Sequence, residues 1–554
     1  MNDASDAEKQ LDELKLREEE ELASILSQKY GIKYLDLTRV SINTDALRLI
    51  PEDKAREAEC AAYDVVGKRL SLAVRSPNQP KLRDVLTSLE EAHYTVEMTM
   101  VSKRSLERAW ERYKDLSFAI ETREGVFDIS SEALAETMAR FKKTSDIVTA
   151  IEEVSQLKKA YRISRILEVV LGGALAIGAS DVHIEPEEES TRLRYRLDGV
   201  LQEVTRFDPE THKLLLSRIK LLSGLKLNVR DRAQDGRFSI ELKGTEIEIR
   251  TSVIPGAYGE SVVMRVLNPD AIAVSFEELG MEPALKELVE REIRKPNGML
   301  LTTGPTGSGK TTTLYACLRK VHTPEVKIIT IEDPIEYHLQ GIVQTQVDKD
   351  YTFLGGLRSA LRQDPDVIMI GEIRDADVAR TAIDSALTGH FVFSTLHTNN
   401  AAGAFPRLAD FGIDLKVVGS AISVALAQRL VRKLCPHCKK ETLLVGKDKE
   451  QVDQIIAGIR NKDVIPENRT VAYAPVGCDQ CNGTGYKGRI GVFEGIVVDK
   501  EISDFVRDNP SESDIRVLEK KRPLLTMAED GVVKILNGVT SFEEVQRVVA
   551  LDEN

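Results

Sequence analysis

One segment of the chain has the residue types and spacing of a phosphate-binding loop. Residues 304–311 read GPTGSGKT and fit G-x-x-x-x-G-K-[ST] at every fixed position. The glycines allow a tight turn whose backbone N–H groups point into one concavity and bind phosphate oxygens. Lys310 adds a positive charge at the β- and γ-phosphates, and the Thr311 hydroxyl is placed to bind Mg²⁺. The pattern predicts a nucleoside triphosphate site formed by Gly304, Pro305, Thr306, Gly307, Ser308, Gly309, Lys310, Thr311 and Thr312.

Acidic residues follow two further apolar segments. KIITIEDPIEYHL, residues 327–339, places Glu332, Asp333 and Glu336 at the end of a β-branched strand. The run VIMI is followed by a glycine and Glu372. Open α/β sheets bind ligands at the carboxyl ends of their strands, so these acids should lie beside the phosphate loop. A carboxylate there can orient the attacking water or hold Mg²⁺.

Two histidines flank a third apolar strand, FVFSTLHT at residues 391–398. His390 precedes the strand and His397 lies at its end. A single histidine would favour a structural role, but two around one strand beside a phosphate loop leave γ-phosphate sensing equally open.

Four of the six cysteines form two C-x-x-C pairs, CPHC at 435–438 and CDQC at 478–481. Two such turns direct four thiolates at one ion, which is the donor set of a closed, structural zinc site. A redox dithiol is disfavoured because the pairs come as two. His437 lies inside the first pair and is interpreted as a bystander. The predicted zinc ligands are Cys435, Cys438, Cys478 and Cys481.

Length and charge narrow the possible functions. A chain of 554 residues corresponds to about three or four domains. The net charge of −13 argues against a protein that coats nucleic acid or anionic membrane. No signal peptide is visible, and the longest uncharged apolar run, 169–179, is far shorter than a membrane helix. Membrane association is therefore expected to depend on protein partners.

The segments between these motifs indicate how the chain is divided. Residues 1–115 contain the strand patterns IKYLDL, RLSLAV and YTVEMTMV and a helical segment, LIPEDKAREAEC, which predict a small α/β domain. Residues 116–155 are charged and helical without an obvious core, which suggests a linker. Residues 156–270 begin with a helix and continue into strands. From 276 to 554, strands and helices alternate as in a parallel sheet, with the cysteine module at 435–495 and a helical tail.

Four motifs together resemble a known family. GPTGSGKTTTLY, ITIEDPIEY, LRQDPDVIMIGEIRD and TGHFVFSTLHTNNA resemble the Walker A, Asp-box, Walker B and His-box motifs of the secretion ATPase superfamily. Within that superfamily the chain is most similar to type IV pilus assembly and type II secretion motor ATPases. GASDVHIEP, RYRLDGVL and AQDGRFSI resemble the second N-terminal domain of those motors. The similarity covers residues 156–554, and the first 115 residues more loosely.

The resemblance implies a multidomain α/β protein. A PAS-like domain would be linked to a RecA-like P-loop ATPase domain, with a small N-terminal α/β domain and a tetracysteine zinc module. Such motors form ring-shaped homo-hexamers that bind ATP and Mg²⁺ between neighbours. The residues carried over as catalytic are Lys310, the water-polarising Glu336, the Walker B acid Glu372, the γ-phosphate neighbour His397, and Arg250 and Arg265 from the PAS-like domain. Arg237 is a weaker candidate, for which a surface salt bridge is preferred.

The same resemblance favours an assembly motor. Pilus assembly and type II secretion motors carry a tetracysteine segment and a first N-terminal domain, which retraction motors typically lack. We expect a cytoplasmic ATPase at the inner face of the membrane that powers pilus assembly through an inner-membrane platform protein, with type II secretion as the alternative. The N-terminal domain is interpreted as a docking domain for other assembly proteins. Cyclic di-GMP binding is disfavoured because KLREEEELASIL is acidic where an arginine- and glycine-containing motif is expected.

Two other classes of function remain as alternatives. A RecA-like nucleic-acid translocase is disfavoured by the acidic chain and its single tryptophan, Trp110. The cysteine module offers nucleic acid only Lys487 and Arg489. A non-catalytic cyclic-nucleotide scaffold is disfavoured by the intact phosphate loop and its acids.

Overall fold

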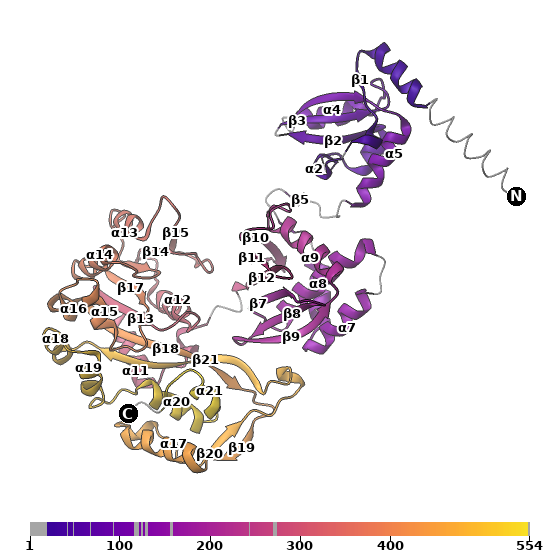
Figure 1. The fold of residues 1–554 in the computed structure, drawn as a ribbon. Coiled ribbons are helices and arrows are strands. Elements are labelled where there is room, and N and C mark those ends of the chain that lie inside the picture. The colour runs from indigo at the N-terminus through magenta and orange to yellow at the C-terminus, as the bar shows by residue number, and fades with distance from the viewer. Residues whose placement is uncertain are drawn as a thin grey trace. The chain divides into compact units, whose positions relative to one another are not determined.

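The computed structural model describes residues 19–551 except 41, 48, 67, 92–93, 116–120, 123–125, 128–130, 156–158, 243 and 270–273 (Figure 1). The chain divides into two compact units, residues 1–120 and 121–554, and each is described by itself. Residues 15–18 of the acidic segment KLREEEELASIL lie outside the described residues, and the chain is helical from 19 to 30. No helix in the described part of the chain is long and apolar enough to cross a bilayer.

The first unit is a four-stranded sheet with helices. The strand order is β1-β4-β3-β2, in which β4 runs parallel to β1 and β3, and β2 runs antiparallel to β3. Its elements are β1 (Lys33–Tyr34), η1 (Leu37–Arg39), α2 (Thr44–Leu47), α3 (Glu52–Glu57), β2 (Cys60–Val66), β3 (Arg69–Val74), α4 (Leu82–Glu91), β4 (Thr95–Met100), α5 (Lys103–Glu111) and η2 (Arg112–Asp115). The helix expected over LIPEDKAREAEC is shorter than predicted, because Glu59 adopts a φ of 46° and Cys60 already begins β2.

The second unit begins with an eight-stranded sheet of order β5-β6-β10-β11-β12-β7-β8-β9. Alternate side chains of TRLRYRL in β8 are buried, including Tyr195, whose hydroxyl donates to Val170 O at 2.6 Å. The arginines between them face outward. The elements are β5 (Glu121–Thr122), β6 (Val126–Phe127), α6 (Ser131–Arg140), α7 (Thr144–Ser155), α8 (Lys159–Ala176), β7 (Asp181–Pro186), β8 (Thr191–Leu197), β9 (Val200–Phe207), α9 (Pro209–Leu222), β10 (Gln234–Leu242), β11 (Thr245–Gly256) and β12 (Gly259–Leu267).

Residues 116–155, expected to be a linker, contain a helix that contributes to the core. α7 buries Ile147, Ala150, Ile151 and Val154 and packs against α8. These positions recur every three or four residues and so form one face of the helix. Two of them flank a pair of glutamates, Glu152 and Glu153, and the surrounding charge hid the apolar face in the sequence.

A seven-stranded sheet of order β15-β14-β16-β17-β13-β18-β21 organises residues 274–551. β13 through β18 pair in parallel, and β21 runs antiparallel to β18. Helices cover both faces: Leu301 of β13 packs with α14 and α16, while Leu300 packs with α12 (Figure 1). The elements up to β18 are η3 (Phe276–Leu279), α11 (Pro283–Glu292), β13 (Gly298–Thr303), α12 (Lys310–Val321), β14 (Ile328–Glu332), β15 (Val343–Gln346), α13 (Phe353–Leu361), β16 (Val367–Ile370), α14 (Ala376–Leu387), β17 (Phe391–Leu396), α15 (Ala404–Asp410), α16 (Leu415–Ala421) and β18 (Ile422–Leu434).

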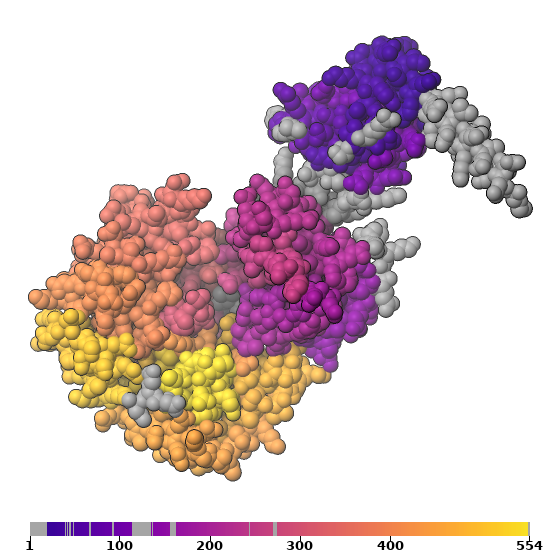
Figure 2. All heavy atoms as spheres, viewed as in Figure 1, coloured from indigo at the N-terminus to yellow at the C-terminus, as the bar shows by residue number. Residues whose placement is uncertain are grey.

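The cysteine pairs lie between β18 and β21, the two longest strands of this sheet. The C-terminal helices form one continuous surface with the preceding segments, as yellow and orange residues show in Figure 2. The remaining elements are β19 (Lys440–Leu443), α17 (Gly446–Gly458), η4 (Lys462–Val464), β20 (Val471–Ala474), η5 (Asp479–Cys481), β21 (Tyr486–Val497), α18 (Lys500–Val506), α19 (Glu512–Glu519), α20 (Met527–Leu536) and α21 (Phe542–Gln546).

Candidate functional site

The predicted phosphate loop connects β13 to α12 at the carboxyl edge of the sheet. Gly304 has a φ of 143°, and a Cβ there would meet Gln428 O at 2.7 Å, so the position requires glycine. Gly309, with a φ of 92°, is the N-cap of α12, which places the positive end of that helix at the loop. The Lys310 ammonium donates to Gly304 O at 2.8 Å and Pro305 O at 3.0 Å. The loop therefore has the strand, helix and charge that phosphate binding requires.

Burial lowers the pKa of Lys310, and the negative charge of Glu372 opposes that shift. Glu372 follows β16, and its Oε2 atom lies 3.1 Å from Nε2 of His397, which follows β17. Arg374 forms ion pairs with Glu372 and, at 3.3 Å, with Asp333. Burial would raise the pKa of Glu372, but the hydrogen bonds and charges of Arg374 and His397 outweigh it and lower that pKa. Glu372 is therefore an anion held at the edge where the loop lies.

The Asp-box acids lie at the end of β14. Glu332 is buried inside a polar cluster, whereas Glu336 is about one-third exposed. Arg250 of β11 reaches this loop: its Nη2 donates to Ile335 O at 2.5 Å and its Nη1 lies 4.0 Å from Glu336 Oε2. Arg250 also pairs with Glu248 at 2.6 Å. A guanidinium is thus placed beside the carboxylate that the sequence predicts to be catalytic.

The other predicted residues are more dispersed. Arg265 pairs with Asp181 at 3.1 Å and is exposed. Arg237 is the most exposed of the three arginines and lies 3.9 Å from Glu248, as expected of a surface salt bridge. His390 lies at the opposite end of β17 from His397, with Nδ1 3.2 Å from Ser385 O. The structure therefore assigns His390 a structural contact. Of the two histidines, only His397 lies at the sheet edge beside Glu372.

Arg429 is a residue at the site that the sequence reasoning missed. It follows Gln428 in β18, and its Nη1 would lie 3.2 Å from a Cβ at Gly304. The guanidinium donates to Gln428 O at 3.0 Å and Asn399 O at 2.8 Å, so it joins the loop to the turn after β17. Burial lowers its pKa. The available signal was the pair Gln428-Arg429, which follows the apolar run VALA within β18.

The four paired cysteines converge on one point. All four Sγ atoms lie within 4.8 Å of one another, and three pairs lie 3.7, 3.8 and 3.9 Å apart. A tetrahedral site with Zn–S bonds of about 2.3 Å places its sulfurs about 3.8 Å apart. Disulfide sulfurs would be about 2.0 Å apart. The spacing therefore fits a four-coordinate metal ion and excludes disulfides in this structure.

The backbone around Cys481 suits a thiolate. The N–H groups of Cys478 and Gly485 both donate to Cys481 Sγ at 3.2 Å. Burial raises the pKa of Cys481, but these hydrogen bonds, together with those to the Cys478 and Cys438 thiols, outweigh it and bring the pKa to about 7. Metal ligation requires the deprotonated form.

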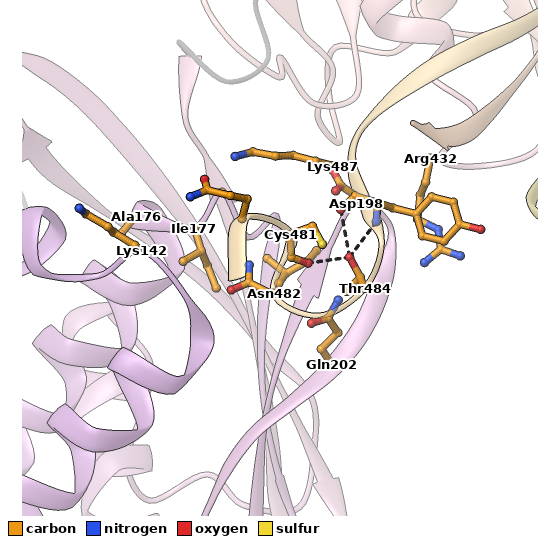
Figure 3. A pocket seen from close by; sticks show the side chains of 14 residues that line it. Lys142, Ala176, Ile177, Asp198, Gln202, Arg432, Cys481, Asn482, Thr484 and Lys487 are labelled. Carbon is orange, nitrogen blue, oxygen red and sulfur yellow. Dashed lines mark hydrogen bonds between the residues drawn. The ribbon is translucent and has the colours of Figure 1, made fainter. Parts of the chain in front are cut away.

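The second cysteine pair also contacts the eight-stranded domain around a cavity of about 140 Å³ (Figure 3). Thr144 N donates to Asn482 Oδ1 at 2.9 Å, and Lys143 pairs with Asp479 at 3.1 Å. Gly488 N donates to Asp198 Oδ2 at 2.9 Å. The second cysteine pair and the residues after it therefore contact both the start of α7 and the turn between β8 and β9.

Comparisons with known proteins match two separate segments of the chain. A family model described as type II/IV secretion system protein matches residues 156–547, and the MshEN domain model matches residues 30–119. The first match includes the phosphate loop, the acids and the cysteine cluster.

Curated relatives match over most of their own length. The type II secretion system protein E of Dickeya dadantii (strain 3937) is 38% identical over 512 residues, which are 92% of this chain and 98% of that protein. The type IV pilus assembly ATPase TfpB of Acinetobacter baylyi is 36% identical over 540 residues, which are 96% of this chain and 88% of that protein. The X-ray structure of the Yersinia pseudotuberculosis ATPase DotB matches with a TM-score of 0.52 at 20% identity, covering 72% of this chain and 95% of that one. This last likeness concerns the fold alone.

Proposed function

The chain belongs to the type II/IV secretion system protein family and is a P-loop ATPase, and from this premise we propose that it is a motor that powers type IV pilus assembly. It would act as a homo-hexamer on an inner-membrane platform protein. The observation that carries the proposal is the convergence of Lys310, Glu372 and His397 at one sheet edge, with Arg250 against Glu336. The relative named TfpB, which covers nearly the whole chain, supports pilus assembly.

The type II secretion motor is the second candidate, because relatives named type II secretion system protein E match equally well. Both functions need the same chemistry. They differ in the machine that the motor turns.

The residues have distinct roles in the proposed reaction. The loop amides and Lys310 bind the phosphates, and Thr311 would hold Mg²⁺, which would neutralise phosphate charge. Glu336 accepts a hydrogen bond from the attacking water and orients it toward the γ-phosphate. Glu372 keeps a negative charge on the Mg²⁺ side of the site, and His397 donates toward the γ-phosphate oxygens. Arg250 and Arg265 supply positive charge as the β–γ bond breaks.

The domains follow from the same proposal. Residues 156–270 would be the PAS-like domain and 276–554 the RecA-like motor with its tetracysteine module, with α6 and α7 packed onto the former. Residues 1–115 would dock assembly proteins, and the motor would lie in the cytoplasm at the inner face of the membrane. Residues 30–119 match the MshEN domain. Cyclic di-GMP binding, which the acidic segment disfavours, is tested by direct titration of the purified protein.

Zinc is the metal that best fits the cysteine cluster. Four thiolates in tetrahedral spacing leave no open position, which is the arrangement of a structural zinc site. Cys435, Cys438, Cys478 and Cys481 would hold the ion and fix the turns around it.

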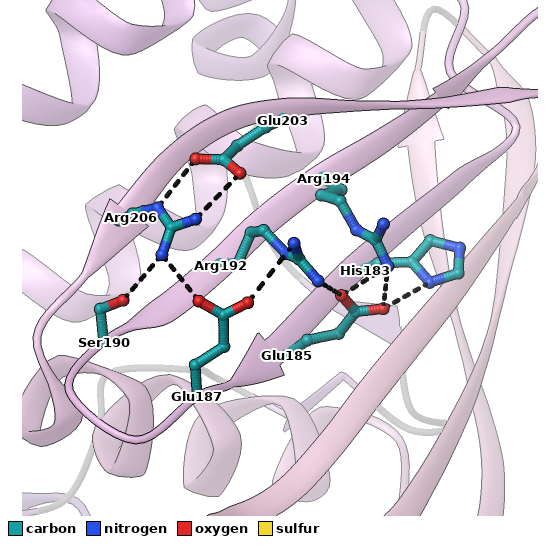
Figure 4. A network of polar contacts seen from close by, with 8 residues as sticks. All are labelled: His183, Glu185, Glu187, Ser190, Arg192, Arg194, Glu203 and Arg206. Atoms are coloured by element: carbon teal, nitrogen blue, oxygen red, sulfur yellow. Dashed lines mark hydrogen bonds and ion pairs between the residues drawn. The ribbon is translucent and has the colours of Figure 1, made fainter.

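A nucleic-acid translocase is a weaker alternative. The most arginine-rich strand, β8, does not present a free basic surface: Arg194 pairs with Glu185 at 2.6 Å, and Arg192 with Glu187 at 3.4 Å (Figure 4). On the neighbouring strand, Arg206 pairs with both Glu187 and Glu203. These ion pairs leave little uncompensated charge for phosphates.

The proposal is tested by phosphate release from the purified full-length protein. Lys310→Ala and Glu336→Gln should each lose about a hundredfold or more in turnover, and the exposed-residue controls Lys349→Ala and Glu287→Gln should retain it. Normal turnover by Glu336→Gln would move the catalytic role to Glu372. DNA or RNA should not stimulate turnover.

The two machines are distinguished in the source bacterium. Replacement of the gene by the Lys310→Ala allele should abolish surface pili and leave protein secretion intact. Loss of secretion with normal piliation would instead support the type II secretion motor.

A further inference from the structure

A buried polar cluster lies between the phosphate helix and the loop that carries Glu336. Its members are Tyr315 of α12, Thr330 and Glu332 of β14, and Gln344 of β15. Tyr315, Thr330 and Glu332 are almost fully buried between α12 and the sheet. Glu332 was one of the acids predicted to lie beside the phosphate loop, but its carboxylate is buried in this cluster. The polar contacts of the four residues therefore need another explanation.

Donors surround the Glu332 carboxylate on three sides. The Tyr315 hydroxyl donates to Oε2, while Thr330 Oγ1 at 2.5 Å and Gln344 Nε2 at 3.1 Å donate to Oε1. Burial raises the pKa of Glu332, and these hydrogen bonds offset part of the rise. Both carboxylate oxygens of Glu332 therefore accept hydrogen bonds, and the loss of one donor should weaken the remaining contacts of the cluster.

The same side chains hold the backbone on either side of Glu336. Glu336 N donates to the Tyr315 hydroxyl at 3.4 Å. Gln344 accepts from Leu339 N at 2.7 Å and donates to Tyr337 O at 3.1 Å. The cluster thus attaches the loop from 335 to 339 at Glu336, at Tyr337 and at Leu339.

Tyr315 connects this loop to the phosphate site because it lies in the second turn of the helix that begins with Lys310. Glu332 connects the cluster to β14, which carries the loop. Arg250 also donates to Ile335 O, so the loop is held by that arginine as well as by the cluster.

We propose that Tyr315, Glu332 and Gln344 are positioning residues that hold Glu336 at a set distance from the phosphate helix. This proposal rests on the catalytic role assigned to Glu336 above. The cluster does not touch the reacting atoms and acts through the backbone of the loop. A carboxylate that must orient water tolerates little displacement, because a shift of about 1 Å can cost up to a hundredfold in rate.

The test compares two tyrosines that differ in one respect. Tyr315 and Tyr337 pack edge to face with ring centroids 4.7 Å apart. The Tyr315 hydroxyl is hydrogen-bonded, whereas the Tyr337 hydroxyl is buried without a hydrogen-bond partner. Both phenylalanine variants of the full-length protein keep the ring, and only Tyr315→Phe removes hydrogen bonds. Tyr315→Phe should lower kcat about tenfold or more with the nucleotide Kd within about twofold of wild type, and Tyr337→Phe should change neither.

Hydrogen exchange gives a second readout that does not depend on catalysis. The amides of residues 335–339 should exchange faster in Tyr315→Phe than in wild type or Tyr337→Phe. Wild-type kcat and wild-type exchange in Tyr315→Phe would overturn the proposal. If that variant does not fold, Gln344→Leu on the edge strand β15 decides by the same two measurements.

The two proposals fail in different ways. If Glu336→Gln keeps normal turnover while Tyr315→Phe loosens the loop, the catalytic assignment of Glu336 is wrong and the positioning of the loop stands. If Glu336→Gln is inactive and neither Tyr315→Phe nor Gln344→Leu changes kcat or exchange, the positioning proposal is wrong and the catalytic assignment stands.

Discussion

Arg250 Nη1 lies 4.0 Å from Glu336 Oε2, so a guanidinium of the eight-stranded domain meets a carboxylate of the loop after β14 within one chain. The same guanidinium also donates to Ile335 O, next to that carboxylate. Arg250 is therefore held against the loop that carries Glu336. The contact belongs to a single copy of the chain.

Arg250→Ala should lower ATP turnover about a hundredfold or more, because it removes positive charge from the breaking bond. Mixed assemblies of Arg250→Ala and Lys310→Ala chains should stay inactive, since each site would lack one group if both act within one chain. The measurement is phosphate release across mixing ratios. Recovery of activity in the mixtures would show that Arg250 acts on a neighbour's site, and Arg237→Ala serves as the exposed-arginine control.

Glu372→Gln should lower kcat about a hundredfold and raise the Mg²⁺ concentration needed for half-maximal rate. The physical reason is the loss of the negative charge that faces Lys310 and is held by Arg374 and His397. The measurement is a Mg²⁺ titration at saturating ATP. An unchanged Mg²⁺ requirement would separate Glu372 from the metal, and Asp410→Asn is an exposed control in the same domain.

Cys435→Ser should remove most of the bound metal and lower the melting temperature of the ATPase domain, because ligand loss opens a site that fixes two turns. Elemental analysis of the wild type should give about one zinc per chain. His437→Gln, inside the same cysteine pair, should keep both metal and stability. A metal-free wild type of normal stability would contradict the assignment.

Glu519 predicts a pH effect on stability. It ends α19 and lines a cavity of about 340 Å³ with Arg429 and Glu494. Burial raises the pKa of Glu519 from 4.5 to about 7, and Arg522 offsets only part of the rise. The folded state therefore binds more protons than the unfolded state, so stability is lost as the pH rises from about 4.5 to about 7.

Glu519→Gln should stabilise the ATPase domain at pH 8 by up to about 3 kcal/mol and by much less at pH 5. Denaturant unfolding across that pH range measures the difference, with the exposed Glu450→Gln as control. A gain that does not vary with pH would show that the effect is packing and not ionisation.

The nucleotide site could largely be predicted from sequence because its parts depend on neighbours in the chain. GPTGSGKT needs a strand before it and a helix after it, and β13 and α12 occupy those places. VIMI coincides with β16, so the position of Glu372 at a strand end was also predictable. The cysteine pairs carry their own turns. The family match confirms the resemblance that these motifs indicated.

Contacts between distant segments could not be predicted in this way. Gln344 binds Leu339 N and Tyr337 O only because β15 pairs with β14 at the sheet edge. Arg429 meets Gly304 only because β18 pairs with β13. The strand at Cys60 was interpreted as helix because local composition does not reveal that Glu59 turns the chain.

The long pairing of β18 with β21 has a mechanical consequence. β18 carries Arg429 beside the phosphate loop and ends one residue before Cys435, and β21 pairs with it to Leu434. At about 3.3 Å per residue, the paired backbone holds the two positions about 20 Å apart. The cysteine cluster and the phosphate loop therefore lie at the two ends of one stretch of paired backbone. Spectroscopic labels at the two ends should keep a constant separation throughout turnover. A movement of the strands at the phosphate loop should therefore also move the cysteine cluster.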